Sequence, residues 1–322
     1  MIGTAASRRV LVAALGAMLA LGAVGCSGGD GGGTTAPPPP PPPVSPPAVT
    51  LDPSGWVTTQ SGAMPLVLVA PHGGDIIPAE LPDRSCAECV TTNDANTMAL
   101  AYAISDAFNA RIGRRPHLVI NRLHRRKFDG NRDRVEATGG YVPLDTMWGY
   151  WQARIEEAKT AATVGHPRAL LLDLHGHAHA VARLEIGYLL SGTQLRGTDD
   201  AVSALIGNTS IARLDVVGSA GVRGAALVRG PASLGSRIVA QGYPAVPSGA
   251  DPAPLAGQDY FNGGFNTLAH GSRAGGAVDA IQIEHHYAGV RDTPENRAAY
   301  ANALVTALLA YFADHYGWTP PA

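Results

Sequence analysis

The chain has 322 residues, and its 24 Lys and Arg and 26 Asp and Glu give a formal net charge of −2 at pH 7. A balance so close to neutral argues against nucleic acid as a partner, because nucleic-acid-binding domains carry a marked excess of positive charge. Hydrophobic residues make up 45% of the chain, which is enough for one large domain with a substantial core.

The N-terminal residues have the pattern of an export signal. Arg8 and Arg9 precede an apolar stretch over residues 10–24, which is short for a membrane span and typical of a signal peptide. The stretch ends in Ala23-Val24-Gly25-Cys26, which resembles the lipobox of bacterial lipoproteins. We therefore expect residues 1–26 to be a lipoprotein signal peptide ending at a lipidated Cys26. A twin-arginine export signal and an uncleaved membrane anchor are the alternatives.

Residues 27–50 are rich in Gly and Pro, with an unbroken proline run over residues 37–43. Such a composition cannot bury a core, so we expect a disordered linker that holds the domain away from a lipid bilayer. The protein would then be exported and anchored in a bacterial cell envelope, in the periplasm or at the cell surface. In that setting Cys86 and Cys89 could form a disulfide, and a redox dithiol is the alternative.

Strands and helices alternate over residues 51–322, which predicts a single α/β domain with a mixed, mostly parallel sheet and helices on both faces. The predicted strands are Leu66–Ala70, His117–Ile120, Ala169–Leu174, Leu184–Leu190 and Ala277–Glu284. The predicted helices run from a cap at Asn93 or Asp94 to Gly113, over Asp145–Thr163, Asp200–Asn208 and Ser233–Gln241, and from a cap at Thr293 to Gly317.

The first candidate site residues follow the first long apolar strand. Pro71-His72-Gly73-Gly74-Asp75 comes directly after it, and the two glycines allow a sharp turn. The carboxyl ends of strands are where open α/β sheets build their sites. Imidazole and carboxylate groups suit Zn²⁺, so His72 and Asp75 are candidate zinc ligands.

A second buried strand also leads into histidines. His175 follows Ala169–Leu174 at once, and His177 and His179 come next. We expect His175 to be the third ligand, because it sits at its strand end as His72 does; His177 or His179 could replace it, and a loop of solvated histidines is a further alternative. Asp173 could orient a ligand histidine or serve the structure alone.

Two further stretches could act on a substrate. Residues 121–133 are the densest cation cluster of the chain, and arginines there could bind a carboxylate through paired hydrogen bonds or polarise an amide carbonyl. A solvated basic loop is the alternative. Glu284 ends another apolar strand and could take a proton from a metal-bound water and deliver it to a leaving amine; an edge-strand glutamate is the alternative.

Together these stretches resemble the N-formylglutamate amidohydrolase family. The similarity rests on Pro71–Asp75, Asp129–Asp133, Leu172–Gly176 and Ile281–Glu284, which occur in that order. The family is related to zinc carboxypeptidases, so the resemblance implies a three-layer α/β/α sandwich. It implies zinc ligation by His72, Asp75 and His175, although the related motif has Glu where this chain has Asp75.

The resemblance also implies roles for the remaining residues. Glu284 would be the general base, Asn131 and Arg132 would grip a substrate carboxylate, and Arg125 or Arg122 would assist the oxyanion. Arg126 is a further candidate for binding the acidic group.

The expected function is zinc-dependent hydrolysis of an amide bond in a small N-acyl amino acid or peptide with a free carboxylate. A second hypothesis is a non-catalytic surface lipoprotein that binds an acidic ligand through its arginine-rich loop. A third is metal storage by the histidines, with several ions per chain.

Overall fold

The structure is a computed structural model that describes residues 53–218 and 220–321. The expected signal peptide, Cys26 and the expected linker lie outside the described residues. None of the described helices is long and apolar enough to cross a bilayer.

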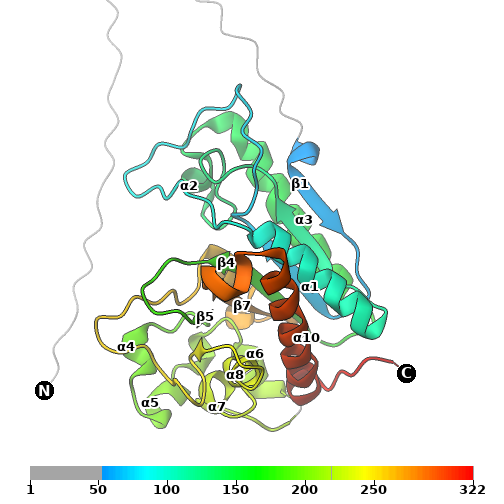
Figure 1. Ribbon diagram of the computed structural model, residues 1–322, viewed down its shortest axis with the longest axis vertical. Helices are drawn as coiled ribbons and strands as arrows, with labels where there is room; N and C mark the ends of the chain where they lie inside the picture. Colours follow the sequence, from blue (N-terminus) through cyan, green and yellow to red (C-terminus); the bar gives the residue numbers. More distant parts are fainter. Residues whose placement is uncertain (1–52, 219, 322) are drawn as a thin grey trace, which may run out of the picture. The chain divides into compact units, whose positions relative to one another are not determined.

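A seven-stranded sheet in the order β1-β3-β2-β4-β7-β5-β6 forms the centre of the described domain (Figure 1). Strands β3, β2, β4 and β7 run parallel to one another, whereas β1 and β5 are antiparallel to their neighbours β3 and β7. The strands are β1 (Val57–Gln60), β2 (Leu66–Ala70), β3 (His117–Asn121), β4 (Ala169–Gly176), β5 (Leu184–Gly187), β6 (Ala245–Val246) and β7 (Val278–His285).

Helices cover both faces of this sheet. The main ones are α1 (Thr97–Ile112), α3 (Asp145–Ala162) and α10 (Pro294–Tyr316). The shorter helices are α2 (Arg134–Thr138), α4 (Gly192–Leu195), α5 (Asp199–Ser203), α6 (Ala212–Val217), α7 (Ala226–Arg229), α8 (Leu234–Val239) and α9 (Phe265–His270). Single turns are η1 (Pro53–Trp56), η2 (Val142–Leu144), η3 (Ile206–Asn208), η4 (Ser272–Ala274) and the kinked η5 (Tyr287–Arg291).

The buried apolar residues form two cores, one on each side of the sheet. Leu66 and Leu68 of β2 point into the larger core with α1 and α10, which pack side by side in Figure 1. Val67 and Val69 point the other way, into a smaller core with α3. This alternation along a strand buried on both faces produces three layers, helix, sheet and helix, and confirms the predicted fold class.

Local signals set most boundaries. Thr293 caps α10 by accepting a hydrogen bond from the backbone N–H of Asn296, and Gly317 ends the helix with φ of 61°. Strand β5 stops at Gly187, earlier than predicted, and Leu189 beyond it has φ of 71°, which a strand cannot accommodate.

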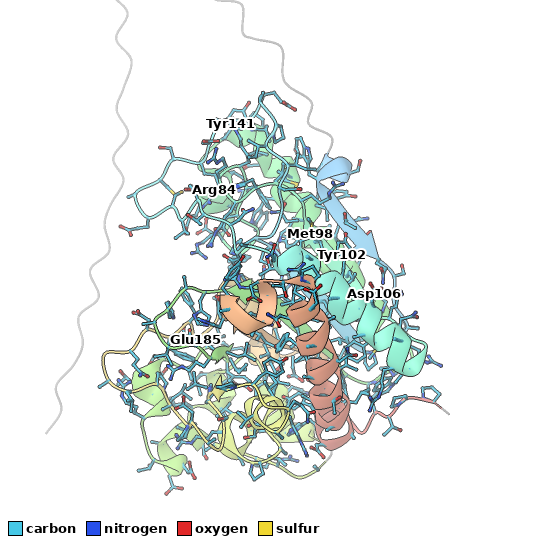
Figure 2. All side chains as sticks on the ribbon, viewed as in Figure 1. Arg84, Met98, Tyr102, Asp106, Tyr141 and Glu185 are labelled. Carbon is cyan, nitrogen blue, oxygen red and sulfur yellow. A yellow bond between two sulfur atoms is a disulfide. The ribbon has the colours of Figure 1, made fainter. Side chains whose placement is uncertain are left out.

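Helix α1 does not begin as predicted. It starts at Thr97 after Asn96, whose φ is 66° and whose side chain makes no capping hydrogen bond. The interpretation of Asn93 or Asp94 as the cap is therefore wrong, and Asp94 is free for another role. Figure 2 labels Met98, Tyr102 and Asp106, which follow one another at four-residue spacing along α1.

Candidate metal centre and pocket

Three side chains from separate parts of the chain meet at the carboxyl end of the sheet. His72 follows β2, His175 lies at the end of β4 and Asp94 precedes α1. His72 Nδ1 lies 3.2 Å from Asp94 Oδ2, His175 Nδ1 lies 3.1 Å from the same oxygen, and the two nitrogens are 3.1 Å apart. Ligand atoms on one tetrahedral Zn²⁺ are about 3.3 Å apart, from bond lengths of about 2.0–2.1 Å. The triangle therefore fits one divalent ion.

The outer nitrogen of each histidine faces a buried carboxylate. His72 Nε2 lies 2.5 Å from Asp129 Oδ1, and His175 Nε2 lies 2.9 Å from Asp173 Oδ2. A carboxylate at the outer nitrogen orients a ligand histidine and leaves the lone pair of the inner nitrogen pointing at the ion. Asp173 therefore has the geometry of an orienting residue.

Backbone and arginine contacts hold the carboxylates. Asp94 Oδ2 accepts a hydrogen bond from the backbone N–H of Gly176 at 3.2 Å. Arg125 donates to Asp94 Oδ1 at 3.2 Å and to Asp129 Oδ2 at 2.9 Å. Arg125 thus holds both Asp94 and Asp129 in position.

The electrostatics of the cluster favour a cation. Burial would raise the pKa of Asp94, but the charges and hydrogen bonds of His72 and His175 outweigh it and hold that pKa well below the usual value. Burial would lower the pKa of His175, but Asp173 and Asp94 outweigh it and raise that pKa well above the usual value. The site therefore stabilises positive charge between its carboxylates.

Glu284 lies beside this cluster on β7, where it is paired in register with His175. Its Oε1 accepts a hydrogen bond from Gln282 Nε2 at 3.0 Å, and its buried Oε2 has no hydrogen-bond partner in the part of the chain that the structure describes. Burial raises the pKa of Glu284 to about 8, against the opposing charge of His175. An acid with one free oxygen and a raised pKa can accept and return a proton near neutral pH.

A cavity of about 170 Å³ opens over the cluster. Its wall includes Asn131, Arg132 and Phe261 together with His72, Asp94, Arg125, His175, Gln282 and Glu284. Asn131 is fixed because its Oδ1 accepts a hydrogen bond from the backbone N–H of Asn266 at 2.8 Å. Arg132 is partly exposed and bonds Glu136 through Nε at 2.7 Å.

The structure brings most of the predicted residues together, but it does not include Asp75. Asp75, the expected ligand, is exposed and lies outside the cluster, and Asp94 supplies the carboxylate there. The glycines before it have no positive φ. They are needed for close packing, since a Cβ on Gly74 would lie 2.2 Å from the carbonyl carbon of Arg122.

Two predicted arginines also lie outside the pocket. Arg122 and Arg126 are exposed and do not line the cavity, in contrast to Arg125 and Arg132. Arg122 directly follows the buried Asn121 at the end of β3, so its side chain points to the other side. A run of cations does not reveal which of its members turn inward.

Sequence reasoning missed Asp94 as a ligand candidate and Asp129 as the partner of His72. Asp94 stands just before a helix, where Asp is a common N-cap. A capping role therefore accounted for this aspartate without a metal. His177 and His179 do not replace His175; they belong to a separate group with Glu185. Cys86 and Cys89 are joined by a disulfide in the segment between β2 and α1.

Solved structures with a similar chain path include hydrolases. An N-formylglutamate amidohydrolase from Ralstonia eutropha JMP134 matches with a TM-score of 0.47 and 16% identity, over 80% of this chain and 97% of that one. A gene product of Agrobacterium tumefaciens gives 0.45 and 13%, over 79% and 94%. The N-acetylmuramyl-L-alanine amidase Ami1 from Mycobacterium smegmatis gives 0.33 and 14%, over 77% and 96%.

The sequence matches no family model and no curated protein. The chemistry of the site therefore rests on its own geometry.

Proposed function

We propose that this chain is a zinc-dependent amidohydrolase that cleaves the amide bond of a small N-acyl amino acid or short peptide with a free carboxylate. The observation that carries the proposal is the triangle of His72 Nδ1, Asp94 Oδ2 and His175 Nδ1, with sides of 3.1–3.2 Å. Two imidazoles and one carboxylate are the donor set of many catalytic zinc sites, which leave a fourth position for water.

When bound, the ion would supply Lewis acidity, lowering the pKa of a coordinated water and polarising the substrate carbonyl. Glu284 Oε2 has no hydrogen-bond partner among residues 53–218 and 220–321 and can receive the proton of the attacking water. The same oxygen then returns the proton to the leaving nitrogen. Gln282 keeps the other oxygen occupied, so one oxygen of Glu284 is directed to this task.

The pocket favours a small acidic substrate. Arg132 at its wall can pair with a carboxylate, and the amide nitrogen of Asn131 can donate to it. A cavity of about 170 Å³ is smaller than the roughly 300–1,000 Å³ of pockets that hold drug-sized ligands. A single acyl amino acid suits this space better than an extended peptide.

Glu284 favours an enzyme over the alternative, a surface protein that only binds an acidic ligand. A binding protein gains nothing from a buried carboxylate with an unpaired oxygen, because such a group costs free energy unless it is used. Placed beside the triangle, the same group is a general base ready for catalysis.

The experiment that tests the proposal uses the purified full chain, stripped by chelation and reloaded with Zn²⁺. We expect the loaded protein to release free amino acid from N-formyl and N-acetyl amino acids, and to act far more slowly on their methyl esters, which lack the carboxylate. Failure of the zinc-loaded protein to cleave any amide in such a panel would contradict the proposal.

We also propose that the enzyme is exported and anchored to a lipid bilayer through Cys26. The Cys86–Cys89 disulfide supports an oxidising compartment, since cytosolic thiols are kept reduced. Substitution Cys26→Ser should move the protein from the membrane fraction to the soluble fraction of expressing bacteria. An unchanged membrane association would contradict lipidation at this residue.

A further inference from the structure

A second group of metal-ligating side chains lies next to the pocket. His177 and His179 follow β4, and Glu185 lies on β5, where Figure 2 labels it. One ligand atom of each residue lies within 4.8 Å of the corresponding atoms of the other two. We call these three residues the HHE cluster; it shares no residue with the triangle of His72, Asp94 and His175.

The hydrogen bonds of His177 prepare it for an ion. Its Nε2 donates to the backbone carbonyl of Arg183 at 2.8 Å, so the lone pair of the neutral ring is on Nδ1. A backbone carbonyl at the outer nitrogen is a common second partner of metal-bound histidines. The Nδ1 lone pair accepts only the backbone N–H of His179, at 3.1 Å, and an ion would compete with that one bond.

Glu185 is a fully buried acid with a single cationic partner. Its exposed fraction is 0%, and within residues 53–218 and 220–321 its only recorded ion pair is with His179 Nδ1, at 2.9 Å. A buried carboxylate is costly unless a cation balances it. A divalent ion between His179 Nδ1 and the Glu185 carboxylate would supply that balance.

The ring of a further histidine lies near the HHE cluster. The ring of His286 lies 5.6 Å from that of His177, and its buried Nδ1 has no hydrogen-bond partner among the described residues. The two imidazoles and one carboxylate of the HHE cluster form a nitrogen-rich donor set, which suits Zn²⁺ and related borderline ions rather than Ca²⁺ or Mg²⁺.

We propose that the HHE cluster is a second binding site for a divalent transition metal such as Zn²⁺. The site connects to the pocket, because Glu185 Oε2 accepts the backbone N–H of Phe261 at 2.7 Å and His179 stacks on the Phe261 ring at 4.6 Å. Since Phe261 lines the cavity, an ion here would fix one wall of the pocket.

The test is the zinc content of the full chain, first stripped by chelation, then loaded with Zn²⁺ and dialysed. We expect two zinc ions per chain for the natural sequence, and one for His179→Ala, whose partly exposed site tolerates the change. Glu185→Gln should also hold one ion, while the control His166→Ala, in neither group, should hold two. Circular dichroism verifies that each variant is folded.

The two sites are separated by reciprocal variants. His72→Ala should retain one ion and lose it when His179→Ala is added. The second site would be overturned if His179→Ala and Glu185→Gln each still held two ions. It would also be overturned if the natural chain held a single ion and His179→Ala held the same one. Neither result would bear on the amidohydrolase proposal, which depends on the ion that His72→Ala removes.

Discussion

The two histidine groups differ in how firmly they are built. In the triangle of His72, Asp94 and His175 the ligand atoms lie 3.1–3.2 Å apart, and both outer nitrogens face buried carboxylates. In the HHE cluster, His179 Nδ1 lies 2.9 Å from Glu185 Oε1, and the Nε2 of His177 faces a neutral backbone carbonyl instead of a carboxylate. The buried carboxylates behind the first group therefore orient its histidines more firmly than the carbonyl orients His177.

The neighbours of the two groups differ as well. Glu284 lies beside the triangle with one oxygen unpaired, whereas both oxygens of Glu185 in the HHE cluster are used, by His179 and by the backbone of Phe261. A metal-binding cluster becomes catalytic only when a free acid and room for a substrate adjoin it. We therefore assign chemistry to the triangle and a supporting role to the HHE cluster.

The largest expected effect comes from the two glutamates that face each other across β5 and β7. Glu284→Gln should lower kcat by roughly 10²–10⁴-fold, because it removes the general base while keeping the shape of the side chain. The matched variant Glu185→Gln should cause a much smaller loss. Equal losses in kcat for the two variants would erase the distinction between catalytic and supporting acids.

The second prediction decides which aspartate completes the triangle. Asp94→Asn should weaken zinc binding at the first site by more than about 100-fold, since loss of even an outer partner of a ligand costs about 10–100-fold. Asp75→Asn should leave affinity unchanged, because Asp75 is exposed and outside the cluster. Competition with a chromogenic chelator measures the zinc affinity of both variants. A large loss in Asp75→Asn with no loss in Asp94→Asn would identify Asp75 as the ligand instead.

The third prediction concerns the outer carboxylates that distinguish the triangle. Asp173→Asn should lower zinc affinity at the first site by about 10–100-fold, because His175 loses the charge that orients it. Zinc bound by the HHE cluster should not respond. If the triangle of His72, Asp94 and His175 kept its zinc affinity in this variant, the carboxylates behind the histidines would have no effect on zinc binding.

The smallest expected effect concerns a buried acid away from both histidine groups. Asp279 accepts hydrogen bonds from the hydroxyls of Ser272 and Tyr316, and burial outweighs these bonds and raises its pKa from 3.8 to about 6. The folded state therefore binds this proton more tightly than the unfolded chain, so the group's contribution to stability falls as pH rises between these values. Asp279→Asn removes the dependence, which amounts to about 1 kcal/mol between pH 5 and pH 7.

Urea denaturation at the two pH values measures this difference. An unchanged pH dependence in Asp279→Asn would mean that its carboxyl is already ionised in the folded protein. Asp94 is the contrasting case, since His72 and His175 lower its pKa in an equally buried setting.

The sequence predicted the layers of the fold well because strands buried on both faces leave continuous apolar runs, as in Leu66–Ala70. It also located His72, His175 and Glu284, since each follows or ends such a run. It missed Asp94, which reaches the site from the start of a helix, at a position where Asp normally signals a cap. The sequence also could not predict which arginines of residues 121–133 face the pocket, because the direction of a side chain such as Arg122 depends on the strand before it.

We propose that His72, Asp94 and His175 hold one catalytic zinc ion. Crystals of the zinc-loaded full chain, measured on both sides of the zinc absorption edge, test it directly. We expect an anomalous peak bonded to His72 Nδ1, His175 Nδ1 and Asp94 Oδ2, with Glu284 beside it. The absence of zinc density among these three atoms in a loaded crystal would contradict it.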